Sequence, residues 1–294
     1  MSTSPGARRI DGRAIAARLR EQAAEVARTL RQRGVQPVLA VADPTAGDEG
    51  AAWYMRSITR AAEQTGIVCQ IHPVDPAGGP AAVTSLLTGL SQDPAVHGVI
   101  CQAPLPAGLT AAAAGACIPV PKDVDGANPA SLGLLTAGLP GAFAPATAAA
   151  VMEILRAEGV PLEGRRAVVV GRSTVVGKPV ALLLLAENAT VTVCHSRTAD
   201  LAAVCRAADV LVAAAGRPGL IGAAHVAPGA VVIDVGITAT AGGVMAGDVD
   251  EAAVTPAAAA LTPVPGGVGP VTTAQLLRQT AEAAWRAETS RCMN

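Results

Sequence analysis

The chain has 294 residues, of which 51% are hydrophobic and 15% are charged. This composition is typical of a folded globular protein, and the length predicts two domains, each with its own core. The 22 basic and 23 acidic residues give a formal net charge of −1. Because no overall field would attract a polyanion, we expect neither nucleic acid nor a membrane as a partner.

The six cysteines and four histidines show no CxxC pair and no spacing typical of metal ligands, so we expect no metal site. The chain opens without a charged segment followed by an apolar one, and it contains no apolar run of about 18 residues. These features predict a cytoplasmic protein.

The N-terminal part alternates helix-like and strand-like segments. Helices are predicted over 8–34, 51–66 and 81–92, and apolar strands over 35–43, 67–74 and 96–106. Strands that alternate with helices at this spacing pair in parallel through right-handed crossovers. The proline- and glycine-rich stretch 104–145 follows, and a loop of this length is uncommon unless it is functional or a linker.

A second alternating series begins after this loop. Helices are predicted over 146–159 and 272–288. Four apolar runs of strand length lie between them, as expected for buried parallel strands: 165–171, 188–196, 208–216 and 229–236. The sequence therefore predicts an α/β protein with parallel sheets.

The helix predicted over 51–66 carries Tyr54, the only tyrosine of the chain, and Ile58 on the same stripe. Arg56 and Arg60 fall largely off this stripe. If the stripe faces the core, the pair is ordinary packing. If it faces a cleft, Ile58 stands where chemistry would be done. The pattern alone favours the core.

A glycine turn follows the strand 165–171. Gly171 ends the strand, and Gly177 comes six residues later at the start of a helix. Glycines at such a turn let backbone amides and the positive helix end approach a phosphate. The spacing is not GxGxxG, so a nucleotide site and a solvated turn both remain open.

The end of the next strand, over 188–196, favours the nucleotide site. A dinucleotide's adenosine ribose is read at this place, where an acidic residue suits NAD and cationic or hydroxyl groups suit the 2′-phosphate of NADP. The chain has His195, Ser196, Arg197 and Thr198 here, with Arg172 in the first turn. This set indicates NADP.

Three further motifs are weak individually. Gln102 ends a strand, and strand carboxyl ends are where open parallel sheets bind ligands. Asp123 and Asp125 in "PKDVDG" are typical of an ordinary turn. The loop "TPVPGGVGPVTT" over 262–273 is glycine-rich and suits the close approach of a flat ligand.

Taken together and in order, these motifs resemble the bifunctional methylenetetrahydrofolate dehydrogenase/cyclohydrolase family over nearly the whole chain. The resemblance rests on Tyr54 with its helix and on "IDGRAIA", "VHGVICQAPLP", "PKDVDG", "VVVGRSTVVGKP", "TVTVCHSRT", "ADVLVAAAG", "VIDVG", "GDVD" and "TPVPGGVGPVT". It implies oxidation of 5,10-methylenetetrahydrofolate by hydride transfer to NAD(P)+, followed by hydrolysis of the methenyl product to 10-formyltetrahydrofolate.

The resemblance also implies an architecture. An N-terminal α/β substrate domain over 1–145, completed by the helix 271–294, would stand beside a Rossmann-type, doubly wound NADP-binding domain over 146–270. The folate cleft would lie between them. A homodimer would form through the Rossmann domains.

The resemblance assigns the family's site residues to the matching positions of this chain. Tyr54 would stack on the folate, Gln102 would assist the chemistry, and Asp125 would hold the pterin. Gly266, Gly267 and Pro270 would shape the substrate site near the nicotinamide. The dinucleotide would be held by Gly171, Arg172, Ser173, Gly177, Ser196, Arg197 and Ile237, with Arg172 and Ser196 at the 2′-phosphate.

The chain departs from the family pattern in four places. The family reads Tyr-x-x-x-Lys, and its lysine is credited with proton transfer in the cyclohydrolase step, whereas this chain has Ile58. Of the family's Pro-Cys-Thr-Pro-x-Gly only Pro145 and Thr147 remain. Ser131 replaces an asparagine, and a serine just before Tyr54 is missing. The dinucleotide motifs are intact, which indicates a kept cofactor and a changed substrate site.

Three hypotheses follow. The leading one is an NADP-dependent dehydrogenase that has lost, or nearly lost, the cyclohydrolase step. The second is an NADPH-dependent reductase of a non-folate imine or iminium. The third is a catalytically silent folate or NADP binder. Turnover of NADP+ with methylenetetrahydrofolate would discriminate among them.

Overall fold

The chain forms two compact units, and the computed structural model describes residues 6–45, 49–239 and 245–293. One unit, here the six-stranded unit, comprises Met1–Ala16 and Thr147–Thr272. The other, here the three-stranded unit, comprises Ala17–Ala146 and Thr273–Asn294. Two long helices, α1 (Gly12–Gln32) and α10 (Val268–Met293), therefore begin in the six-stranded unit and continue in the three-stranded unit.

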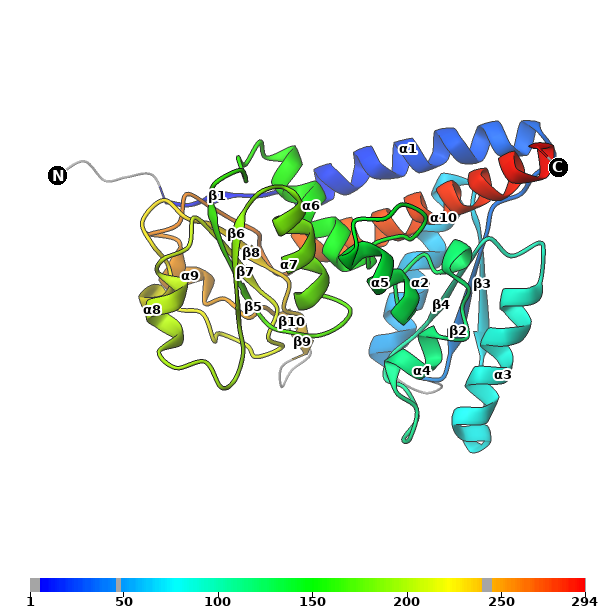
Figure 1. Cartoon of the computed structure of the whole chain (residues 1–294), viewed down its shortest axis with the longest axis horizontal. Coiled ribbons are helices and arrows are strands. Elements are labelled where there is room, and N and C mark those ends of the chain that lie inside the picture. Colours follow the sequence, from blue (N-terminus) through cyan, green and yellow to red (C-terminus); the bar gives the residue numbers. More distant parts are fainter. Residues whose placement is uncertain (1–5, 46–48, 240–244, 294) are drawn as a thin grey trace. The chain divides into compact units, whose positions relative to one another are not determined.

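The six-stranded unit is built on a parallel sheet with the strand order β1-β11-β8-β7-β5-β6. Figure 1 labels these strands except β11. Its strands are β1 (Arg8–Arg9), β5 (Arg166–Val170), β6 (Thr190–Cys194), β7 (Val210–Ala213), β8 (Val231–Asp234) and β11 (Ala260–Leu261). The helices of this unit are α6 (Ala146–Ala157), α7 (Gly177–Ala186), α8 (Leu201–Cys205) and α9 (Glu251–Val254). Strand β9 (Thr238–Ala239) pairs antiparallel with β10 (Met245–Ala246).

The central strands of this sheet are apolar because helices and loops cover both faces. All four residues of β7 are buried, as are four of the five residues of β5. One face packs its side chains on α8 and α9, and α7 contacts β5 and β6. The apolar runs of the sequence are thus explained by two-sided burial, and the predicted α/β fold with a Rossmann-type sheet is confirmed.

The N-terminal residues differ from the prediction. The helical pattern predicts a first helix that begins at residue 8, and the family resemblance groups this segment with the substrate domain. In the structure Arg8 and Arg9 form β1, which pairs with β11, and the amides of Arg8 and Ile10 donate to Ala259 and Leu261. Pairing with a strand about 250 residues away leaves no periodic signal in the sequence, because both arginine side chains are exposed.

The three-stranded unit contains the parallel sheet β3-β2-β4. Its strands are β2 (Val38–Asp43), β3 (Val68–Pro73) and β4 (Gly98–Cys101). Its helices besides α1 and α10 are α2 (Glu49–Thr65), α3 (Gly79–Gln92), α4 (Ala111–Gly115) and α5 (Pro129–Thr136), with short 3-10 turns over Pro76–Gly78 and Val120–Lys122.

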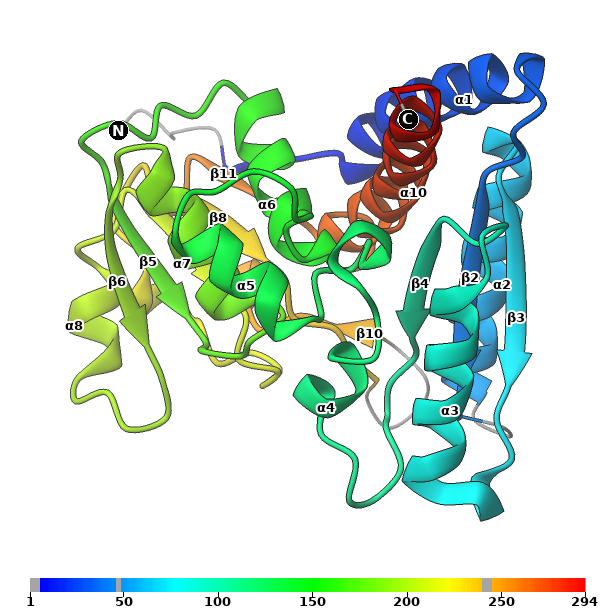
Figure 2. The ribbon, with the colours of Figure 1, turned by 45° about the vertical axis from the view of Figure 1, so that its right-hand side comes forward.

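Strand β2 separates two cores of this unit. Leu39 and Val41 pack with α1, α2 and α10, while Val38, Ala40 and Ala42 pack with α3 and α4. This alternation follows the two-residue period of a strand. Helices α1 and α10 lie side by side in both views of the ribbon (Figures 1 and 2).

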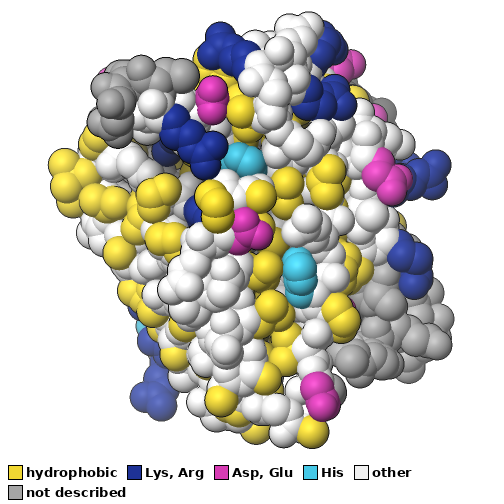
Figure 3. Space-filling model, turned by 90° about the vertical axis from the view of Figure 1, so that its right-hand side faces the viewer, with side chains coloured by type: hydrophobic (Ala, Val, Ile, Leu, Met, Phe, Trp, Pro, Cys, Tyr) yellow, Lys and Arg dark blue, Asp and Glu magenta, His cyan; other side chains and the backbone are white. Residues whose placement is uncertain are grey.

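The surface reflects the low charge content. On the face drawn in Figure 3, charged side chains are sparse and hydrophobic side chains interrupt the neutral surface. Among the described residues, no helix is both long and apolar enough to span a bilayer.

Candidate active site

The glycine turn after β5 lies at the carboxyl edge of the six-stranded sheet. The amide of Gly171 donates to the Cys194 carbonyl at 2.9 Å, and Gly171 adopts φ +137°. A Cβ atom at Gly171 would lie 2.1 Å from the carbonyl oxygen of Ala214, and one at Gly177 would lie 2.3 Å from that of Gly171. Both glycines are therefore required for backbone packing between β5, α7 and the end of β7.

Ser173 braces the same turn. Its Oγ accepts hydrogen bonds from the amides of Val176 at 3.2 Å and Gly177 at 3.3 Å. The neighbouring Arg172 is exposed and extends from the turn. The hydroxyl thus satisfies amides at the start of α7, and the guanidinium is accessible to a ligand.

A second turn, over 195–198, lies beside the first because β5 and β6 are paired up to Val170 and Cys194. His195 donates its amide to Thr198 Oγ1 at 2.8 Å, and the Thr198 amide donates to the His195 carbonyl at 2.8 Å. Ser196 and Arg197 are exposed at the tip. The two turns together present Arg172, Ser196 and Arg197 with no carboxylate among residues 195–198.

Two buried aspartates organise the other loops at this edge. Asp248, fully buried, accepts the amides of Ala215, Gly216 and Arg217 at 2.5–3.0 Å. Asp234, at the end of β8, accepts the amides of Gly236, Asp248 and Val249. Burial raises the pKa of Asp234 to about 6 against the opposing effect of these amides. Neither carboxylate is among the site residues predicted from the sequence.

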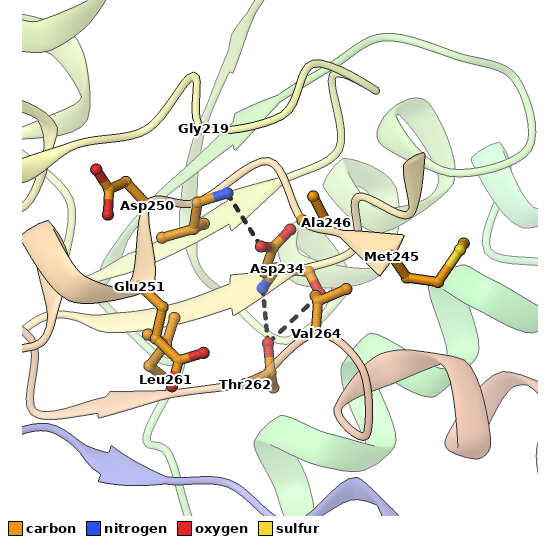
Figure 4. A pocket seen from close by; sticks show the side chains of 11 residues that line it. Gly219, Asp234, Met245, Ala246, Asp250, Glu251, Leu261, Thr262 and Val264 are labelled. Carbon is orange, nitrogen blue, oxygen red and sulfur yellow. Dashed lines mark hydrogen bonds between the residues drawn. The ribbon is translucent and has the colours of Figure 1, made fainter. Parts of the chain in front are cut away.

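A cavity of about 380 Å³ lies beside Asp234 (Figure 4). Thr262 Oγ1 accepts the amide of Asp234 at 2.7 Å and stands on its wall with Val264. None of the site residues predicted from the sequence lines this cavity. The cavity is therefore separate from the predicted dinucleotide residues.

The loop before α10 brings several predicted residues together. Gly266 adopts φ +107°, and the amide of Gly267 donates to the Pro263 carbonyl at 2.8 Å. A Cβ atom at Gly269 would lie 3.4 Å from Ile237 Cδ1, so Ile237, which is 53% exposed, lies over the start of α10 near Pro270.

Gly12 was missed as a positioning residue. A Cβ atom there would lie 1.8 Å from the carbonyl oxygen of Gly267. The start of α1 thus packs directly against the backbone of the predicted ligand-binding loop.

In the three-stranded unit, Tyr54 and Asp125 lie close enough to interact electrostatically. Tyr54 is half-buried against the core, and burial, Asp125 and Cys69 all raise its pKa. The carboxylate of Asp125 accepts the amide of Ala146. Burial and the nearby charge of Asp123 raise the pKa of Asp125 to about 7, although the Ala146 amide opposes this shift.

Gln102 lies at the carboxyl edge of the three-stranded sheet. It directly follows β4, and its amide donates to the Ala42 carbonyl at 2.9 Å. Val99 of β4 forms a parallel bridge with Asp123, so the segment that leads to Asp125 runs alongside the strand that leads to Gln102. The side chain of Gln102 donates to the Ala103 carbonyl at 3.0 Å.

Ile58 points into the core. Its side chain has no exposed surface and packs in the cluster that contains Leu39, Ile100, Val124 and Leu277. Tyr54 lies at the margin of this cluster and Ile58 inside it. The stripe that they share therefore faces the interior, as the helical pattern favoured.

Two of the other departures have structural partners. Ser131, which is buried, donates its hydroxyl to Asp123 Oδ2 at 2.6 Å, and Asp123 also accepts the amides of Ala127 and Asn128. A Cβ atom at Gly126 would lie 2.5 Å from the Pro145 nitrogen. Pro145 thus packs against the turn that holds Asp125. The side chains of the residues just before Tyr54 lie outside the described part of the chain.

The parallel sheet order and the glycine turn at its carboxyl edge are those of a Rossmann-type fold, the class that binds dinucleotides. Residues 145–288 match the tetrahydrofolate dehydrogenase/cyclohydrolase NAD(P)-binding domain, and residues 10–125 match the catalytic domain of the same family. The chain belongs to the tetrahydrofolate dehydrogenase/cyclohydrolase family.

Known relatives match over almost their full length. The chain is 60% identical to the bifunctional protein FolD of Parafrankia sp. over 94% of this chain and 99% of that protein. It is 56% identical to bifunctional protein FolD 1 of Rhodococcus jostii over 94% of this chain and 93% of that protein.

Among solved structures, FolD from Campylobacter jejuni matches with a TM-score of 0.91 and 37% identity, covering 94% of this chain and 98% of that one. The Trypanosoma brucei enzyme, complexed with NADP cofactor and inhibitor, also has a TM-score of 0.91 and 37% identity, covering 97% and 99%.

Proposed function

We propose that this chain is an NADP-dependent oxidoreductase that transfers a hydride between NADP and the methylene bridge of 5,10-methylenetetrahydrofolate, with a lost or weak cyclohydrolase activity. The complete burial of Ile58 among apolar side chains carries the second part of this proposal. The substrate is assigned to the three-stranded unit and the dinucleotide to the six-stranded unit.

The two turns at the carboxyl edge of the larger sheet support NADP. Arg172, Ser196 and Arg197 are exposed there and suit a 2′-phosphate. The first acidic residue after the second turn, Asp200, already accepts the Ala203 amide at the start of α8. When bound, the nicotinamide would supply the hydride acceptor, and the protein's task is to orient the substrate carbon against it.

The substrate residues suit hydride transfer. The half-buried ring of Tyr54 offers a face for stacking, and Asp125 offers a carboxylate acceptor to a ligand's N–H groups. Gln102 stands at the same sheet edge. Moving a hydride requires alignment of two carbons and no proton shuttle at the reacting carbon.

Hydrolysis of the methenyl bridge does require proton management, and such general acid/base help is typically worth about 10²- to 10⁴-fold. Isoleucine has no ionisable group, and the side chains of Arg56 and Arg60 lie off the Tyr54 stripe. Asp125, whose pKa is raised to about 7, is the carboxyl group that interacts with Tyr54. Residual hydrolysis would depend on it.

Two assays on the purified chain test the proposal. Reduction of NADP+ with methylenetetrahydrofolate should be measurable, while the decay of added methenyltetrahydrofolate should not exceed the uncatalysed rate. Efficient hydrolysis by the wild type would overturn the proposed loss of the cyclohydrolase step and leave the dehydrogenase assignment intact. Absence of NADP+ reduction would overturn the dehydrogenase assignment.

One observation keeps a second candidate open. Ala146 and Ala148 are buried where the family carries a cysteine and a proline, which indicates a remodelled substrate side. An NADPH-dependent reductase of a non-folate imine would use the same hydride geometry. Oxidation of NADPH by cyclic imines, with no turnover of folates, would identify this activity, and dinucleotide binding without any turnover would identify a silent binder.

A further inference from the structure

A pair of buried glutamines on α10 contains an unused hydrogen-bond acceptor. Gln275 is 2% exposed and Gln279 is 4% exposed. Gln279 Nε2 donates to the carbonyl oxygens of Val124 at 2.5 Å and Ala144 at 3.2 Å. Gln275 Nε2 donates to Gln279 Oε1 at 2.8 Å. Within the described part of the chain, Gln275 Oε1 has no partner.

The orientation of both amides follows from this chain of bonds. Two carbonyl oxygens can only be served by the NH₂ end of Gln279, so its oxygen must face Gln275. That oxygen needs a donor, which fixes the NH₂ end of Gln275 toward it. The oxygen of Gln275 is consequently the free end of the pair. Leaving such an acceptor buried and unpaired is unfavourable, so its retention calls for a partner outside the described contacts.

The position of the free oxygen follows from the segment that runs along α10. Arg286 donates to the Gly141 carbonyl, and Gln279 donates to the Ala144 carbonyl. The seven residues from Gln279 to Arg286 span about 10 Å of helix, which is also the length of three extended residues in the facing segment. Gln275 lies one further turn toward the N-terminus of α10, at the level of Ala146. The amide of Ala146 donates to Asp125.

This register puts the amide oxygen of Gln275 at the level of the Asp125 carboxylate, so that two acceptors would face one edge of a ligand. Such a pair is complementary to the edge of a heterocycle that carries two N–H donors, as a 2-amino-4-oxopyrimidine ring does. We propose that Gln275 is a specificity-determining residue whose Oε1 accepts a hydrogen bond from the exocyclic amino group of the substrate's pteridine ring, beside Asp125. This assignment rests on the proposed folate substrate.

The test compares ligand binding by calorimetry in the full-length wild type and in Gln275→Met, which keeps the volume and removes the acceptor. The probes are tetrahydrofolate and its 2-desamino analogue. The Kd of Gln275→Met for tetrahydrofolate should rise about 3- to 10-fold, as expected for one lost neutral hydrogen bond. Its Kd for the analogue should equal that of the wild type, because that ligand lacks the donor.

Thr280→Val is the matched control on the same helix. Thr280 is fully buried, and its hydroxyl already bonds the Leu276 carbonyl at 2.9 Å, so this change should leave both affinities unaltered. An unchanged tetrahydrofolate Kd in Gln275→Met, with a higher Tm, would show an acceptor that is merely unsatisfied or bound to water and would overturn the assignment. An equal loss of affinity in Thr280→Val would overturn it as well.

The wild type alone provides a check if Gln275→Met does not fold. It should bind the 2-desamino analogue at least about 3-fold more weakly than tetrahydrofolate, and equal affinities would overturn the role of Gln275. Failure of the wild type to bind tetrahydrofolate at all would instead overturn the proposed substrate.

Discussion

At the residue scale, position 58 carries the proposed loss of the hydrolytic step, because isoleucine has no ionisable group. Ile58 is enclosed by apolar neighbours, so a charged group placed there would lose most of its hydration. Burial lowers the pKa of a lysine, which is the direction a proton-transfer group needs. The same burial makes the substitution unfavourable for folding.

Ile58→Lys should therefore gain hydrolytic activity and lose thermal stability. We expect methenyltetrahydrofolate hydrolysis to rise above the uncatalysed rate, since the amine stands at the family's position, together with a lower Tm. Ile58→Met is the control, because it has a similar unbranched reach without the amine and should not hydrolyse the substrate. A lysine variant that is folded, binds folate and remains inactive would show that this position does not reach the reacting carbon.

Arg172→Ala tests the cofactor preference. Charge-assisted hydrogen bonds contribute about 1.5–3 kcal/mol, so KM for NADP should rise about 10- to 150-fold while KM for NAD changes little. Arg165→Ala, an exposed arginine at the amino end of β5, should change neither. A wild type with equal or better kcat/KM for NAD would contradict the preference.

Asp125 makes stability depend on pH. Burial raises the pKa of its carboxyl to about 7 in the folded protein, from an ordinary value of 3.8. Below pH 3.8 both states are protonated; between the two values only the folded state keeps the proton, so stability falls as pH rises toward 7. Asp125→Asn should raise Tm relative to wild type at pH 8 and leave it nearly equal at pH 3.5. A Tm difference that is the same at both pH values would contradict the shift.

At the element scale, backbone contacts between distant segments hold the predicted ligand loops. Gly12 lets the start of α1 touch the Gly267 carbonyl, and Gly171 lets the end of β5 touch that of Ala214. The sequence showed the strands, because two-sided burial produces apolar runs, and it showed the glycine turn. It did not show β1 or the roles of Asp234 and Asp248, because their partners are brought together only by the folded chain.

Gly12→Ala should disrupt one such contact. The new Cβ atom would stand 1.8 Å from a backbone oxygen that cannot move without shifting the loop before α10. We expect a clear fall in Tm and in dehydrogenase activity together. Gly89→Ala is the control, because Gly89 is exposed in α3 with open space around it and alanine favours helix there. A Gly12→Ala protein as stable as wild type would contradict the close packing.

At the scale of the whole molecule, β6 is an edge strand of the larger sheet. Val193 on β6 is 40% exposed and Leu185 on the neighbouring α7 is 60% exposed. Unpaired strand edges with apolar side chains favour association with another chain. We propose that two copies pair through the six-stranded units.

Sedimentation at micromolar concentration should give twice the chain mass of 29.1 kDa. Val193→Lys places a charge on this edge and should give monomers. Val68→Lys, on the edge strand β3 of the smaller sheet, is the control and should leave the dimer intact, since Val68 has a similar exposure of 42%. A monomeric wild type would exclude the dimer.

Asp234 and Asp248 also affect the affinity and the rate of ligand binding. Each carboxylate ties down three backbone amides, which fixes the loops after β7 and β8 without any bound molecule. A site that is already ordered loses little conformational entropy when it is filled. The free energy of each contact with a dinucleotide would therefore appear almost undiminished in its affinity, and association would not have to wait for loops to fold.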